Sequence, residues 1–205
     1  MSVTTEQTVD VTREELQRLL DAQRAAQALD PIPDAATRRD RIDRFVAAVL
    51  EHADELAAAL DADFGSRPAT TSIELDILGG MGSITFAREN FEEWMAPIEV
   101  PGGLGGAFPT YIQNRPKGVV GVIGPWNFPV VLAFVPTVEA LAAGNRVMIK
   151  FSDMTPRAGA VFARAVASRM SPEEVVVVNG GLATATAFAD LRLDHIFFTG
   201  SPKVG

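Results

Sequence analysis

The first hundred residues repeat apolar positions with the period of an α-helix. Thr12 and Glu15 have the spacing of a capping box, in which the hydroxyl accepts from the later amide and the carboxylate accepts from the earlier one. This pair predicts a helix over about 12–29. A second helix is predicted over about 34–61, and the turn-forming sequence at 65–68 ends it.

A second capping box, Thr71 with Glu74, predicts a third helix. Glycines at 79, 80 and 82 weaken this prediction, because each glycine inside a helix costs about 1 kcal/mol relative to alanine. Such a triplet can also mark a close helix crossing. The apolar positions of this helix are Ile77, Leu78, Ile84, Phe91 and Trp94. We interpret 1–96 as a helical segment whose apolar stripes face a core.

Prolines and glycines become frequent from residue 97. The glycine cluster at 102–106 resembles a phosphate loop only superficially, since no strand and helix flank it in order and no Gly-Lys-Ser/Thr follows. Residues 108–115 are predicted as a strand, and 98–100 with 111–113 as a hairpin. We therefore assign 97–117 to the start of a β-arm.

From residue 118 onward, short apolar runs alternate with helical stretches, which indicates βαβ units and a parallel sheet covered on both faces. Thr155 followed by Pro156 is a good N-cap and first-turn pair. The runs are 119–123, 146–149, 175–178 and 195–198, and the helices are 130–142, 156–170 and 182–190. The predicted fold class is α/β: a helical segment followed by a doubly wound, Rossmann-like and incomplete sheet over 118–205. Ligands of such a sheet bind at the carboxyl ends of its strands.

Composition narrows the classes of function. The 205 residues carry a formal charge of −8 and no basic run, so we expect neither nucleic acid nor an acidic membrane as a partner. No apolar window approaches the roughly 20 residues of a membrane span, and the polar N-terminus does not resemble a signal peptide, so we expect a cytoplasmic protein. Zero cysteines and two histidines make a metal site improbable, and none is predicted.

Distinctive residues follow each apolar run. Gly-Pro-Trp-Asn-Phe-Pro occupies 124–129, Lys-Phe-Ser-Asp occupies 150–153, Asn-Gly-Gly occupies 179–181, and Phe-Thr-Gly-Ser-Pro-Lys-Val-Gly occupies 198–205. Together this set resembles the aldehyde dehydrogenase superfamily, whose members show P-W-N-[FY]-P, K-P-S-E and F-T-G-S-x-x-x-G in this order. Residues 143–150 and 62–65 look most like the coniferyl aldehyde dehydrogenase branch. The resemblance implies NAD(P)-dependent oxidation of an aldehyde, of the aromatic coniferaldehyde kind, to a carboxylic acid.

The resemblance assigns a catalytic role to Asn127. In the family reaction a thiolate attacks the aldehyde carbonyl, and the tetrahedral adduct carries an oxyanion that needs a fixed donor. Asn127 matches the side-chain donor, whose neutral amide does not titrate. The alternative is that Asn127 only satisfies the backbone of a turn between two prolines.

Three further matches would bind the cofactor. Lys150 matches the lysine at the adenosine ribose, although a lysine at a strand end is usually just solvated. Gly200, Ser201 and Gly205 match the pyrophosphate segment, where free amides and a hydroxyl at a helix start suit phosphate. Trp126 is expected to line the cofactor cleft, with a structural role as the alternative.

The match departs from the family at two positions. Phe151 replaces a proline, and Asp153 stands where the family commonly has a glutamate that accepts from the ribose hydroxyls. A carboxylate near the ribose 2′ position repels a 2′-phosphate, so Asp153 favours NAD. Its side chain is one methylene shorter than that of glutamate, so NADP stays open as the cofactor.

The resemblance also implies that parts of the enzyme lie outside this chain. The nucleophilic cysteine, the general-base glutamate and the catalytic domain are absent, so we expect a fragment that is inactive alone. A different nucleotide-binding oxidoreductase and a non-catalytic nucleotide-binding or assembly module are the alternatives. The full-length enzyme is expected to act on a small aldehyde and to form a homo-oligomer through the β-arm.

Overall fold

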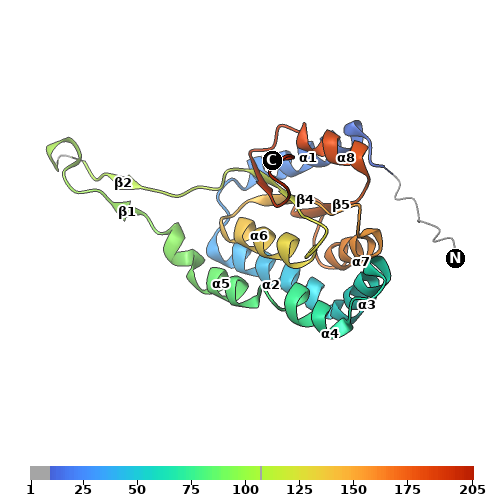
Figure 1. Ribbon diagram of the computed structural model, residues 1–205. Coiled ribbons are helices and arrows are strands. Elements are labelled where there is room, and N and C mark those ends of the chain that lie inside the picture. The colour runs from blue at the N-terminus through green and yellow to red at the C-terminus, as the bar shows by residue number, and fades with distance from the viewer. Residues whose placement is uncertain (1–9, 107) are drawn as a thin grey trace.

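The computed structural model describes residues 10–106 and 108–205, which form a four-stranded parallel sheet with helices on both faces and a hairpin that projects from one side (Figure 1). The sheet contains β3 (Val119–Ile123), β4 (Arg146–Lys150), β5 (Val175–Val178) and β6 (His195–Phe198). The helices beside it are α1 (Arg13–Leu29), α2 (Ala35–Glu51), α3 (Ala53–Phe64), α5 (Met81–Met95), α6 (Val131–Ala142), α7 (Pro156–Ala167) and α8 (Leu182–Ala189).

The strand order, β5-β4-β3-β6, is that of a doubly wound sheet. β3 comes first along the chain but lies between β4 and β6, with Val120 opposite Val147 on one side and His195 on the other. The chain adds β4 and β5 on one side of β3 and then returns to add β6 on the other side. This arrangement confirms the predicted α/β class, and it creates a topological switch point at the carboxyl ends of β3 and β6.

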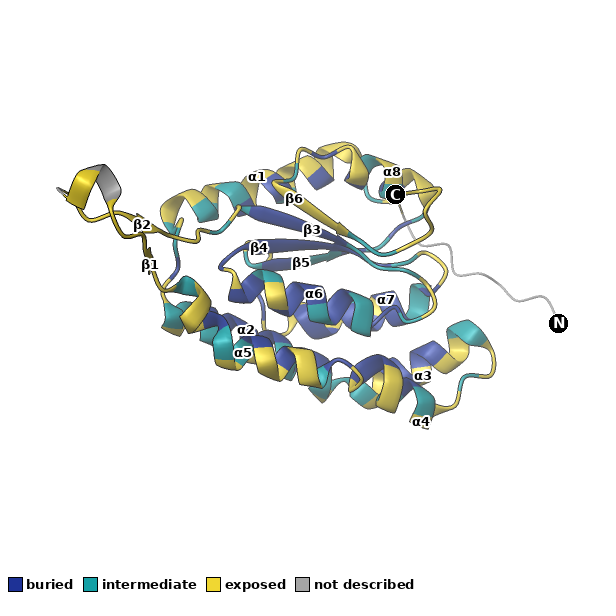
Figure 2. Cartoon of the chain, turned by 60° about the vertical axis from the view of Figure 1, so that its left-hand side comes forward, coloured by how far each residue is buried: buried dark blue, intermediate teal, exposed yellow. Residues whose placement is uncertain are grey.

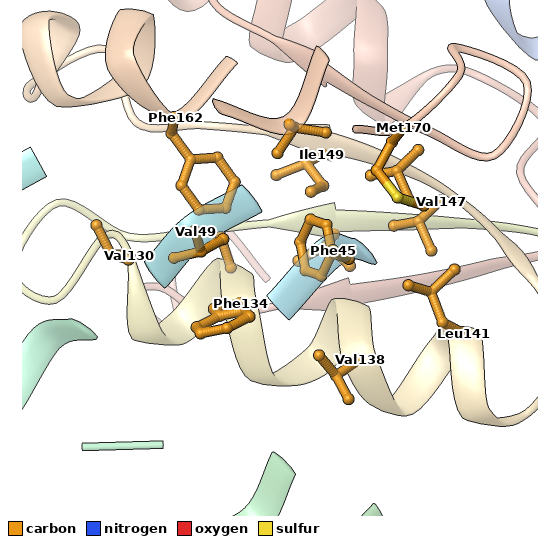
Figure 3. Packing of buried hydrophobic residues seen from close by; sticks show 14 of the residues in the cluster. Phe45, Val49, Val130, Phe134, Val138, Leu141, Val147, Ile149, Phe162 and Met170 are labelled. Carbon is orange, nitrogen blue, oxygen red and sulfur yellow. The ribbon is translucent and has the colours of Figure 1, made fainter. Parts of the chain in front are cut away.

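The larger core lies under one face of the sheet. Helices α6 and α7 pack on this face, and α2, α3 and α5 form a further layer beneath them (Figure 2). The Phe45 ring of α2 packs edge-on against Phe134 of α6, with ring centroids 5.6 Å apart, and against Phe162 of α7 at 6.3 Å (Figure 3). The N-terminal helices and the sheet therefore share one continuous core.

Helices α1 and α8 cover the opposite face (Figure 2). Leu16 and Leu20 of α1 and Phe188 of α8 are fully buried there. The buried amide of Gln23 also donates to the Val147 carbonyl of β4 at 3.0 Å. The first helix thus belongs structurally to the sheet, whose first strand begins about ninety positions after the helix ends. One half of its predicted capping box is confirmed, because the Thr12 hydroxyl accepts from the Glu15 amide at 3.2 Å. The reciprocal bond from the Thr12 amide to the Glu15 carboxylate does not form among the described residues.

The prediction of one helix over 34–61 was wrong. The chain forms α2 and α3 with a break at His52, whose ψ of 17° departs from the helical region and whose backbone amide bonds no further back than Val49. The break redirects the chain so that α3 lies against α7, and Asp54 and Glu55 then stand in the first turn of a new helix, where negative charge is favourable.

The capping box predicted at Thr71 was also wrong. The helical region begins earlier, with the short α4 (Ala69–Thr71), and continues as a π-helical turn, η1 (Ser72–Ile77), without a side-chain cap. A bend at the glycines then separates this turn from α5. At Gly80 a side chain would overlap those of Val131 and Val135 of α6. Gly80 therefore accommodates a close crossing with α6, whereas a side chain at Gly79 would meet the Leu75 backbone and one at Gly82 would meet nothing.

The hairpin is confirmed, although its strands are short. β1 (Ile98–Glu99) pairs antiparallel with β2 (Tyr111–Ile112), and the Val100 amide extends the ladder to the Thr110 carbonyl at 2.8 Å. The strand predicted over 108–115 is thus limited to two residues, because no strand among the described residues other than β1 pairs with it (Figure 1). In the described residues, no helix has the length and hydropathy needed to cross a membrane.

Candidate functional site

The loops that carry the predicted site residues all leave one edge of the sheet, because parallel strands end on the same side. Backbone bonds connect them: Gly124 donates to the Lys150 carbonyl at 3.2 Å, and Phe151 donates to the Val178 carbonyl at 3.1 Å. Thr199 donates to the Ile123 carbonyl at 3.1 Å. Four segments spread over 80 residues of sequence therefore form one edge.

Asn127 lies at the tip of the loop that follows β3. Its side chain is exposed, and among residues 10–106 and 108–205 its amide makes no hydrogen bond. Only its backbone carbonyl is held, by Nη1 of Arg67 at 2.9 Å. A turn-stabilising role for the side chain would require a bond to nearby backbone, which this geometry does not contain. The amide is therefore free to donate to a ligand.

The start of α6, directly after this loop, is capped by a residue from a distant element. Oδ1 of Asp76, in η1, accepts from the amides of Val130 at 3.1 Å and Val131 at 3.0 Å. The Asp76 side chain is fully buried, and Nη2 of Arg67 lies 3.5 Å from its Oδ2. Burial raises the pKa of Asp76 to about 6, against the lowering effects of the two amides and of Arg67.

Aspartates of the N-terminal segment also cap α7 and α8. The Asp63 carboxylate accepts from the amides of Arg157 at 3.2 Å and Ala158 at 2.9 Å. Asp10 accepts from the Gly181 amide at 2.7 Å and from the Thr184 hydroxyl at 2.8 Å, and these bonds lower the pKa of Asp10. The helices that follow β3, β4 and β5 thus each receive a carboxylate at their amino end.

Thr155 corrects the sequence interpretation at α7. It occupies the N-cap position, as predicted, but its side chain makes no capping bond, and its buried hydroxyl has no partner among the described residues. Asp63 binds the free amides instead, because a carboxylate is a stronger acceptor than a hydroxyl. The helix also ends at Ala167 rather than at Met170.

Lys150, at the end of β4, is buried rather than solvated. Its ammonium donates to the Phe151 carbonyl at 2.6 Å. Burial lowers the pKa of Lys150, while the negative charges of Asp153 and Asp10 oppose that shift. Asp153 itself is exposed in the turn that follows β4, so its carboxylate is open to a ligand at this edge.

The segment after β6 is exposed and forms a single turn, in which Val204 and Gly205 donate to the Ser201 carbonyl at 3.0 and 3.2 Å. At Gly200 a side chain would overlap the Phe198 ring, so the ring would have to move to admit one. In the described parts of the chain the Ser201 hydroxyl has no hydrogen-bond partner. Beside this turn lies an apolar cleft of about 420 Å³, lined by residues of β3, α8 and β6 together with Val204 and Gly205.

Comparison with known proteins decides the family. The sequence profile described as "Aldehyde dehydrogenase family" matches residues 3–205. The chain belongs to the aldehyde dehydrogenase family. The predicted resemblance is thereby confirmed at the level of the family.

Among curated aldehyde dehydrogenases, a probable coniferyl aldehyde dehydrogenase of Caulobacter vibrioides is 42% identical over 192 residues, which cover 91% of this chain and 39% of that protein. A coniferyl aldehyde dehydrogenase of a Pseudomonas species is 37% identical, with 95% and 40% covered. The chain thus spans about two fifths of the length of these relatives.

Solved aldehyde dehydrogenases share the fold. A substrate-bound Staphylococcus aureus AldH superposes with a TM-score of 0.86 at 27% identity, over 92% of this chain and 41% of that one. A P. syringae indole-3-acetaldehyde dehydrogenase in complex with NAD+ and IAA gives 0.82 at 25% identity, over 96% and 40%.

The aldehyde dehydrogenase motifs found in the sequence thus meet at one edge, but the residues that hold them there were missed. No local signal marks a capping or bracing role for these residues, because each acts on a segment at least 54 positions away. They are Asp10, Asp63, Arg67 and Asp76. The described residues contain no group of three potential metal ligands.

Proposed function

We propose that this chain forms the cofactor-binding part of an NAD(P)-dependent aldehyde dehydrogenase that oxidises an aromatic aldehyde of the coniferaldehyde kind to a carboxylic acid. The observation that carries this proposal is the meeting of four strand-end loops at one edge with the Asn127 amide unbonded. The two coniferyl aldehyde dehydrogenase relatives support the substrate class.

The residues at this edge fit a dinucleotide. The apolar cleft beside β6 has the size and lining to hold a flat ring such as adenine. Lys150 uses one of its three N–H donors on Phe151, which leaves two for ribose hydroxyls, and the exposed Asp153 carboxylate can accept from the same hydroxyls. The free Ser201 hydroxyl, with Gly200 and Gly205, suits a pyrophosphate. A bound nicotinamide would supply the hydride acceptor.

Within this chemistry Asn127 performs one step. The adduct formed when a nucleophile attacks the aldehyde carbon carries an oxyanion, and the exposed Asn127 amide donates to it. Trp126 is 51% exposed, and its ring lies 6.3 Å from that of Phe64 at an interplanar angle of 40°, so it forms a wall beside that donor rather than part of the core. This position suits the proposed role of Trp126 at the cofactor cleft.

The hairpin suits a contact between subunits of the complete enzyme. Ile98, Tyr111 and Ile112 are each more than half exposed, and an isolated two-stranded ribbon gains stability when another chain covers such residues. We therefore propose that the complete enzyme is a homo-oligomer that uses the β-arm.

The function is tested with a complete enzyme, built by joining residues 1–205 to the remainder of the Caulobacter vibrioides relative, which we call the chimeric enzyme. We expect NADH formation that depends on coniferaldehyde. Residues 1–205 alone should form none, since the chain contains no cysteine to supply a thiolate. Turnover by residues 1–205 above a blank, or a chimeric enzyme that folds and binds NAD without turnover, would overturn the proposal.

The lack of cysteine also favours a second candidate, a non-catalytic nucleotide-binding or assembly module. This candidate forecasts that purified residues 1–205 bind NAD or form a stable oligomer. Because the first proposal also places cofactor binding and a subunit contact in this chain, the chimeric enzyme distinguishes the two candidates. NADH formation that depends on coniferaldehyde supports the first, whereas a folded chimeric enzyme that binds NAD without turnover supports the second.

A further inference from the structure

Arg67 connects three parts of the site. It lies between α3 and α4, and its side chain is only 10% exposed. Nη1 donates to the Asn127 carbonyl at 2.9 Å, and Nη2 lies 3.5 Å from Oδ2 of Asp76. The guanidinium carbon lies 4.8 Å from the centre of the Phe64 ring and 5.0 Å from that of Phe128. The planar group is therefore held by two rings as well as by its polar partners.

Asp76 completes this arrangement from the other side. Its Oδ1 binds the first amides of α6, whereas Oδ2 is buried and makes no hydrogen bond within the described parts of the chain. The ion pair with Arg67 is thus the partner of Oδ2. One acid–base pair fixes the segment 127–131 at two points: Arg67 at the carbonyl of Asn127 and Asp76 at the amides of Val130 and Val131.

The Asn127 side chain depends on this bracing, because it has no hydrogen bond of its own in the described chain. Its orientation follows from the position of its backbone. We propose that Arg67 and Asp76 are positioning residues, which hold the Asn127 backbone so that its amide points at the developing oxyanion. This inference rests on the proposed function of Asn127. A misplacement of about 1 Å in such a group can cost up to 10²-fold in rate.

An arginine suits this role better than a lysine. Its planar fork can bond the Asn127 carbonyl and the Asp76 carboxylate at once, and it stacks on both neighbouring rings. Arg38 provides a matched control, because it is also buried and also binds α6, but at the far end, through the Ala142 carbonyl at 3.0 Å. Loss of Arg38 should destabilise α6 without moving the Asn127 loop.

A double-mutant cycle in the chimeric enzyme tests the proposal. Arg67→Gln should lower kcat roughly 10-fold or more, with the KM for NAD nearly unchanged. In an Asn127→Ala background the same substitution should have little further effect on kcat, since the group that it positions is gone. Arg38→Gln should lower the melting temperature and leave the kcat of folded enzyme near normal.

A second readout does not require activity. In residues 1–205 with Trp94→Phe, Trp126 is the sole tryptophan and reports the order of this loop. The fluorescence anisotropy of Trp126 should decay with a larger fast, local component in Arg67→Gln and in a second variant, Asp76→Asn. Arg38→Gln should leave this component unchanged.

The outcomes separate the two proposals. If Asn127→Ala leaves kcat unchanged, the catalytic role of Asn127 fails. If Asn127→Ala lowers kcat but Arg67→Gln does not, or if the two effects multiply fully, Asn127 stays catalytic and the positioning role of Arg67 is wrong. Unchanged anisotropy decay in both the Arg67 and the Asp76 variant would also overturn it.

Discussion

The Asp63 carboxylate, near the end of α3, accepts a 2.9 Å hydrogen bond from the backbone amide of Ala158 in the first turn of α7, 95 positions later in the chain. The Asp63 side chain is 1% exposed. A helix cap that is normally supplied by an adjacent residue is here supplied by a packed neighbour. The N-terminal helices therefore stabilise the α/β unit through its helix ends as well as through the shared core.

The first prediction concerns this cap. Asp63→Ala should lower the free energy of unfolding of residues 1–205 by about 1–2 kcal/mol, because two partly buried backbone amides lose their acceptor. Urea unfolding measures the loss. Asp61→Ala, at an exposed position of the same helix, is the control and should stay within about 0.5 kcal/mol of the parent. Equal midpoints for the two variants would contradict the capping role.

The second prediction concerns the buried carboxyl of Asp76. Burial raises its pKa in the folded state to about 6, above the ordinary value of about 3.9 in an unfolded chain. The folded state therefore binds more protons between these values, and the contribution of Asp76 to stability falls as the pH rises from about 4 through 6. The fall is on the order of 2–3 kcal/mol.

Asp76→Asn removes this titration. Urea unfolding of residues 1–205 at several pH values gives the free energy of unfolding of parent and variant. The parent value minus the variant value should decline between pH about 4 and 6 and level off above. Asp43 gives a control of opposite sign: the hydrogen bond from Arg88 lowers the pKa of Asp43, so its contribution is lost as the pH falls. If the difference in free energy of unfolding between the parent and Asp76→Asn does not change with pH, Asp76 does not titrate in this range.

The third prediction concerns cofactor choice. In the chimeric enzyme, Asp153→Ala should raise the kcat/KM for NADP relative to that for NAD, because it removes negative charge from the site proposed for the ribose 2′ position. Because Asp153 is exposed, its substitution should not impair folding, so a changed ratio reports cofactor choice. Asp54→Ala, on the outer helix α3, should leave the ratio unchanged. An unchanged ratio in the Asp153 variant would remove that residue from the cofactor site.

The fourth prediction concerns Asn127. In the chimeric enzyme, Asn127→Ala should lower kcat by roughly 10²–10³, the usual loss for one oxyanion donor. The dissociation constant for NAD should change little, since the role lies at the aldehyde carbon. Melting temperature, NAD affinity and kcat measured on one preparation distinguish this from a turn residue. A destabilised variant with near-normal turnover would mean that the side chain only supports the loop.

Much of the architecture was predictable because it depends on neighbours in sequence. The hydroxyl of Thr12 and the amide of Glu15 are one helical turn apart, so their bond needs no distant residue. The apolar runs at 119–123 and 175–178 form strands because apolar, mostly β-branched residues in an unbroken run favour a sheet covered on both faces. Those strands in turn placed Asn127 and Lys150 at the same edge.

Two of the errors fall where a distant contact outweighs the local pattern, and one falls where a helical region starts before its expected cap. The apolar periodicity of 34–61 continues through His52, yet the chain breaks there so that α3 can pack on α7. Thr71 has the spacing of a cap and does not act as one, because the helical region already starts at Ala69. Thr155 has the ideal position for capping α7, but Asp63 arrives from another helix with a stronger acceptor.

The sequence by itself determined the α/β class, the parallel strands, the hairpin and the family motifs, since each depends on residue type and short spacing. Only the tertiary structure decided that Lys150 is buried, that Asp76 is a buried acid with a raised pKa, and that Arg67 holds the Asn127 carbonyl. These properties follow from desolvation and from bonds between segments far apart along the chain. Neither is encoded in the pattern around the residue itself, because both require the packed neighbours to be in place.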